Sequence, residues 1–120
     1  MSHILVHIST GPENPTKAAL GFLVARTVLD KGHRLSLFIA GDGVNLLRKE
    51  TAAALVGIGT GALAEHVAAL DKSDAEILYS GMSAKARGLD PADLAIARAA
   101  PAMPDKLIDL TLEADAVLCY

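Results

Sequence analysis

The sequence predicts a three-layer α/β/α domain built on a mostly parallel sheet of about five strands. Its apolar runs are short and nearly continuous, which is typical of strands covered by helices on both faces. Stretches with helical periodicity separate these runs, so strands and helices alternate along the chain. Such alternation favours a doubly wound sheet with right-handed crossovers.

Four apolar runs have the length of strands, and a fifth is shorter. The four runs are residues 4–8, 35–40, 75–79 and 116–120. The fifth, residues 95–98, follows an Asp90-Pro91 pair, which predicts a single turn of helix before it. We therefore expect residues 95–98 to form a short fourth strand, before the last strand at residues 116–120.

The first helix has clear start and stop signals. Asn14 can cap it, Pro15 suits its first turn and Gly32 ends it, so it spans about residues 16–31. Gly21 lies inside it at a cost of about 1 kcal/mol relative to alanine, so we expect close packing there. Its apolar stripe consists of Ala18, Phe22, Ala25 and Leu29.

Two further helices follow from the same periodicity. Each has one apolar face, and the later helix spans about residues 104–114. The apolar residues are Leu63, Val67 and Leu70 in the earlier helix, and Leu107, Leu110 and Ala114 in the later one.

Composition narrows the class of protein. At 120 residues the chain predicts a single domain over residues 1–120. The net charge of −3, with no basic block, argues against nucleic acid as a partner, and no apolar run approaches the ~18 residues of a membrane helix. One cysteine and no visible signal peptide predict a cytoplasmic protein.

The chain is apolar for its size. Hydrophobic residues make up 52% of it, and the mean hydropathy is +0.37. A small domain has little interior in which to bury so many apolar side chains. We therefore expect another subunit to cover part of the surface, as in a homo-oligomer.

The loops after the first three strands are the predicted ligand site. In open parallel sheets, ligands bind outside the carboxyl ends of the strands. Here those loops are rich in glycine and small polar residues. The candidate binding residues are Thr10, Gly11, Asn14, Asp42, Gly43, Ser80, Gly81, Met82, Ser83 and Arg87. Asp42 can bind a ligand or close a turn, and Arg87 can bind an anion or form a salt bridge.

These same loops make the chain resemble the DsrE-like family of sulfur-relay proteins, whose fold is similar to that of flavodoxins. The similarity runs from about residue 3 to the end. It rests on segments 11–18, 38–44, 59–63, 80–89 and 113–118, and is most specific at 83–88, Ser-Ala-Lys-Ala-Arg-Gly, after a strand. The resemblance implies a small homo-oligomer, a trimer or hexamer, with relay proteins as possible partners. It also implies a site near a subunit boundary.

The resemblance places Ser80 where relay members carry their persulfide cysteine. A persulfide carrier needs an accessible thiolate, and a serine hydroxyl is barely ionised at neutral pH. We therefore expect an accessory or binding protein without catalytic residues. The alternative is sulfur transfer through Cys119 or a partner's thiol, although Cys119, in an apolar strand, is expected to be a buried thiol.

A second alternative is a flavin or nucleotide binding module. The loop around Ser9 and Thr10 resembles a flavodoxin phosphate loop, but two prolines remove donors and Glu13 adds a negative charge. Residues 57–62 match G-x-G-x-x-A by letter, yet a helix precedes them in place of the required strand, which favours a glycine-rich connection. No cofactor is predicted.

The histidines do not predict a metal site. His3 and His7 share one face of a strand but lie about 13 Å apart. We expect His7 to be partly buried with its ring hydrogen-bonded. His66, on the second helix, is expected to be exposed, and there it could act as an acid or base.

Overall fold

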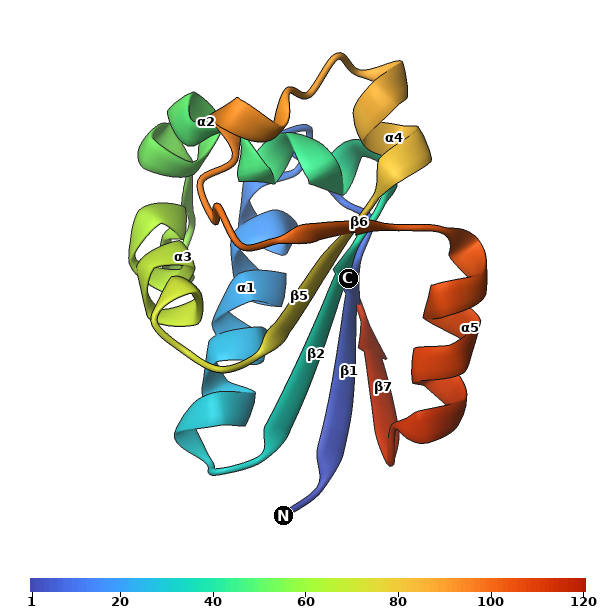
Figure 1. Cartoon of the computed structure of the whole chain (residues 1–120). Helices are drawn as coiled ribbons and strands as arrows, with labels where there is room; N and C mark the ends of the chain where they lie inside the picture. The colour runs from blue at the N-terminus through green and yellow to red at the C-terminus, as the bar shows by residue number, and fades with distance from the viewer.

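The computed structural model describes residues 1–120 as a central five-stranded sheet with helices on both sides (Figure 1). The strand order is β6-β5-β2-β1-β7, and every neighbouring pair in it is parallel. The predicted fold class is therefore confirmed. The strands are β1 (His3–Ile8), β2 (Arg34–Ile39), β5 (Glu76–Ser80), β6 (Ala100–Ala102) and β7 (Ala116–Cys119).

Five α-helices, two 3₁₀ helices and a small hairpin connect these strands. The α-helices are α1 (Pro15–Asp30), α2 (Lys49–Ala54), α3 (Leu63–Asp71), α4 (Gly81–Ala86) and α5 (Pro104–Glu113). The 3₁₀ helices are η1 (Gly41–Leu47) and η2 (Pro91–Asp93), and the antiparallel hairpin pairs β3 (Val56–Gly57) with β4 (Gly61–Ala62).

Helix α1 begins and ends where the sequence predicts. The Asn14 side chain accepts a hydrogen bond from the backbone N–H of Lys17 at 3.2 Å, and Pro15 occupies the first turn. Gly32 follows the helix with a φ of 81°, a conformation that glycine adopts without strain. At Gly21, a Cβ would lie 3.0 Å from the Ile8 side chain, so the predicted close packing is present.

The two faces of the sheet are covered unequally. Helices α1, α2 and α3 lie on one side and α5 on the other (Figure 1). The first side holds a cluster of 24 buried hydrophobic residues. The α5 side holds only four, namely Leu5, Phe38, Leu78 and Leu110. Most of the hydrophobic stabilisation therefore comes from the α1 side.

The prediction of a strand at 95–98 is wrong, because that segment is irregular and the strand begins at Ala100. Ile96 is fully buried in the main core, and the Arg98 guanidinium donates to the carbonyls of Leu70, Ser73 and Ala75. Anchored in this way, the segment cannot align with β5. The single helical turn expected before it is present as η2, and Asp90 caps it.

None of the helices is both long enough and apolar enough to cross a membrane. The longest, α1, has 16 residues, and its exposed side includes charged residues.

Candidate functional site

The loops after β1, β2 and β5 meet at the carboxyl edge of the sheet. The Gly41 backbone N–H, after β2, donates to the Ser83 hydroxyl, after β5, at 2.9 Å. Gly11, after β1, lies so close to Asp42 that a Cβ would be 2.2 Å from the Asp42 carbonyl oxygen. Glycine at position 11 thus permits the first two loops to touch.

Arg87 joins the second loop to the third. Its guanidinium lies 2.8 Å from the Asp42 carboxylate, and it also donates to the Ser83 carbonyl at 3.2 Å. Arg48 in turn donates to the Arg87 carbonyl at 2.6 Å. The Asp42 side chain keeps 61% of its surface exposed, whereas that of Arg87 keeps 30%. The pair therefore presents an exposed carboxylate held by a partly covered cation.

Ser80 ends β5 and caps α4. Its hydroxyl accepts a hydrogen bond from the Ser83 backbone N–H at 3.1 Å, and the residue is 8% exposed. The side chain is thus fixed at the first turn of a helix and is largely buried. Such a position lowers the pKa of a cysteine thiol, but for serine it provides only a hydrogen-bonding group.

The other candidate residues are divided between the edge surface and structural roles. Thr10 is half-buried and Met82 is 59% exposed. Asn14 is occupied as the cap of α1, and Gly43 packs against the Ile8 carbonyl. The predicted loop at 41–43, where Gly43 lies, is in fact the first turn of η1. The remaining candidate, Gly81, opens α4.

The first loop directs a carboxylate at its own backbone. The Glu13 carboxylate accepts from the Gly11 N–H, with one of its oxygens at 2.9 Å. A phosphate group would need that donor. The geometry therefore adds nothing in favour of flavin binding.

Residues 57–62 lie outside the main sheet. They form the β3–β4 hairpin between α2 and α3, so the expected connection between helices is confirmed and includes two short strands. Since α2 precedes them, the context that a dinucleotide fingerprint requires is missing.

His7 is half-buried as predicted, whereas its ring hydrogen bond and the burial of Cys119 differ from their predictions. The expected hydrogen bond of the His7 ring is absent, because its buried Nε2 has no partner. Burial lowers the pKa of His7 by removing water from the ring, which favours the neutral form. Cys119 is exposed rather than buried, because β7 is an edge strand without a covering helix. The apolar sequence of β7 is typical of a central strand, but the fold places β7 at the edge of the sheet.

His66 is buried, not exposed as predicted. Only 3% of it is accessible, and its Nε2 is 2.7 Å from the Thr60 carbonyl oxygen. It therefore fixes the β3–β4 hairpin to α3. His3 and His7 do share the α5 face of the sheet. No group of three or more His, Cys, Asp and Glu side chains gathers to hold a metal ion.

A chain of polar contacts beside α5, buried at His3 and Ser36 and partly exposed at Glu76 and Lys106, was not predicted. The Ser36 hydroxyl donates to the Glu76 carboxylate at 3.3 Å and accepts from Nε2 of His3 at 2.8 Å. Lys106 of α5 lies 3.9 Å from the same carboxylate. The alternation of residues along β1 and β2 shows which side chains share a face, but it does not reveal the register that brings His3 to Ser36.

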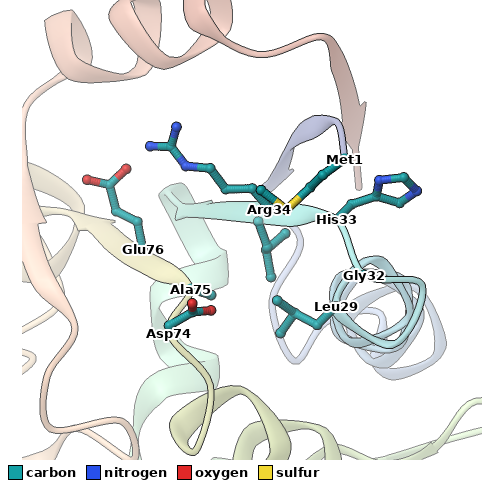
Figure 2. Close-up of a pocket in the computed structure, with 9 residues that line it drawn as sticks. Met1, Leu29, Gly32, His33, Arg34, Asp74, Ala75 and Glu76 are labelled. Atoms are coloured by element: carbon teal, nitrogen blue, oxygen red, sulfur yellow. The ribbon is translucent and has the colours of Figure 1, made fainter.

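The larger of the two cavities lies at the opposite end of the sheet from the candidate residues. It measures about 490 Å³ and is partly lined by the loops that precede β2 and β5. Figure 2 shows the Arg34 guanidinium and the carboxylates of Asp74 and Glu76 around it. Neither cavity includes a candidate residue, so the edge of Ser80 and Asp42 is a surface rather than an enclosed pocket.

Comparisons with known proteins place the chain by family and fold. Residues 2–120 match the model of the DsrE/DsrF-like family. No curated protein sequence matches the chain. The crystal structure of the ychN protein from E. coli is similar, with 18% identity, a TM-score of 0.83 and complete coverage of both chains. The protein of unknown function MTH1491 from Methanobacterium thermoautotrophicum has 16% identity, a TM-score of 0.76 and the same coverage.

Proposed function

This chain belongs to the DsrE/DsrF-like family, and from that premise we propose that it is an accessory or binding protein of sulfur relay that does not itself carry persulfide. The observation that supports this is the hydroxyl of Ser80, fixed at the start of α4 at the position where the resemblance implies the carrier cysteine. A hydroxyl cannot accept sulfane sulfur under mild conditions.

The surface that we propose for binding is the carboxyl edge of the sheet. The Asp42–Arg87 pair and the Ser83 hydroxyl lie together there. Thr10 belongs to the same surface, because it precedes Gly11, which contacts Asp42. An exposed carboxylate beside a cation and hydroxyls suits a polar partner segment or a small polar ligand. Relay proteins are the proposed partners.

We also propose that the protein is a homo-oligomer, a trimer or hexamer. On α5, Leu112 is 81% exposed and Ile108 is 59% exposed. Burying such side chains against another copy is favourable by the hydrophobic effect. Native mass spectrometry gives the stoichiometry directly, and a Leu112→Glu variant is expected to shift it toward monomer. A monomeric wild-type protein would contradict this proposal.

The chemical test uses a persulfide donor and intact mass. In sulfur transfer, a protein thiolate attacks the donor's sulfane sulfur, a new S–S bond forms, and the donor leaves as a thiolate. We expect wild-type protein to gain no sulfur from one equivalent of donor, although an excess of a disulfide reagent can reach the exposed Cys119 thiol. In a Cys119→Ser background, Ser80→Cys is expected to gain the mass of one sulfur atom, whereas Cys119→Ser alone gains none. Failure of Ser80→Cys to load would contradict the assignment of position 80.

A second candidate function is persulfide transfer through Cys119. The exposure of this thiol on the edge strand β7, opposite His7 in the register, favours it. It predicts that wild-type protein gains one sulfur atom and that Cys119→Ser abolishes the gain. That result would replace the first proposal.

A further inference from the structure

An apolar groove lies between α1 and the edge strand β7, on the face of the sheet away from α5. Its volume is about 400 Å³, within the range of small-molecule sites. The floor is Ile4 of β1, and Leu118 of β7 forms one wall. The other wall and the ends consist of Leu23, Val24, Thr27, Val28, Lys31 and His33.

The groove exists because α1 packs over β1 and β2 and leaves β7 uncovered. Leu118 is 40% exposed as a result. Thr27, a polar residue of the helix wall, donates its hydroxyl to the Leu23 carbonyl at 2.8 Å. The Thr27 hydroxyl therefore already has a hydrogen-bond acceptor. The rest of the groove's walls is apolar over most of its length.

A single cation, Lys31, and the ring of His33 lie where α1 ends, next to the exposed Asp30. Lys31, the C-terminal cap of α1, is exposed and forms no ion pair. The Nδ1 of His33 accepts from the Ser2 backbone N–H at 3.1 Å, so the proton of the neutral ring is on Nε2. The Lys31 and Gly32 backbone N–H groups donate to the carbonyls of the last turn, which reduces repulsion of an anion there.

We propose that this groove binds a small amphipathic anion, a medium-chain carboxylate. The chain would lie along α1, with its carboxylate at Lys31 and His33. From Leu23 to Lys31 the helix rises roughly 12 Å, a length suited to such a chain. This inference goes beyond the proposed function, because it involves the opposite end of the sheet from Ser80.

The experiment is isothermal titration calorimetry with decanoate, below its micellar concentration, and with decyltrimethylammonium as the cation of equal chain length. We expect saturable binding of decanoate in preference to the cation. Lys31→Glu is expected to weaken decanoate binding by about fivefold, the upper end of what one exposed ion pair contributes. Lys72→Glu is the matched control, because Lys72 is also an exposed helix cap but lies outside the groove.

A further variant decides whether another copy of the chain covers the groove. Val24→Asp places a charge on the apolar wall and is expected to abolish decanoate binding while leaving the oligomer size unchanged by light scattering. Circular dichroism verifies that each variant is folded. Absence of saturable binding, equal binding of both head groups, or a change of oligomer size with Val24→Asp would each overturn the proposal.

Discussion

His7 of β1 and Cys119 of β7 are directly opposite each other in the parallel register, so their side chains lie on the same face of the sheet. The ring of His7 also packs edge-on against Phe38, with centroids 6.0 Å apart. One side of the imidazole is therefore covered by the aromatic core, and the other lies beside an edge strand. This arrangement gives two of the predictions that follow.

Cys119 is expected to react in the native protein. Its exposure on β7 gives a disulfide reagent direct access, whereas a core thiol would react only after unfolding. The measurement is the rate of labelling by a chromogenic disulfide, with and without denaturant, with Cys119→Ser as the blank. A thiol that is silent until denaturant is added would show that another subunit covers β7.

His7→Leu is expected to reduce the loss of stability at acid pH. Because the folded-state pKa of His7 lies below the ordinary histidine value of 6.5, the unfolded chain binds the proton more tightly. Stability from neutral His7 is present above that value and decreases as the pH falls through it toward the folded-state pKa. Melting temperatures between pH 8 and 5 should therefore fall less steeply in the variant.

The matched control for this pH series is His33→Leu. His33 is half-buried near the N-terminus, away from the His7 site. If His7→Leu and wild type show parallel pH profiles, the pKa of His7 is not lowered by folding.

The Asp42–Arg87 pair is expected to have a small coupling energy, below about 1 kcal/mol, because Asp42 is largely exposed. Arg87→Ala should cost more than Asp42→Ala, since it also removes a hydrogen bond to the Ser83 carbonyl. A double-mutant cycle by urea unfolding measures both quantities. A coupling of several kcal/mol would show that the pair is desolvated, as it would be within a subunit boundary.

Gly11→Ala is expected to destabilise the protein by about 1–3 kcal/mol, the usual range for overpacking. The added Cβ would lie 2.2 Å from the Asp42 carbonyl oxygen, so the first two loops would have to separate. Gly81→Ala is the control at the same edge, because the nearest atom to its Cβ would be 3.6 Å away. Urea unfolding of both variants is the measurement, and equal costs would argue against close contact between the loops.

The elements that depend on local chemistry were predictable from the sequence. Continuous apolar runs predicted four of the five strands, and Asn14, Pro15 and Gly32 predicted the ends of α1. The loops of the carboxyl edge also followed, because parallel strands necessarily place these loops at one end. The small strand β6 was misplaced by a few residues. The apolar Ile96 suits a strand as well as the core, and the length of Arg98 does not reveal that it reaches backbone carbonyls.

Which of these residues meet depends on how the elements pack. Asp42 and Arg87 are 45 positions apart, and neither residue type indicates the other as its partner. The exposure of Cys119 and the burial of His66 likewise depend on the position of a strand or helix within the fold. Local patterns reflect backbone preference and periodicity, whereas burial and ion pairing arise from long-range packing, which no short stretch of sequence contains.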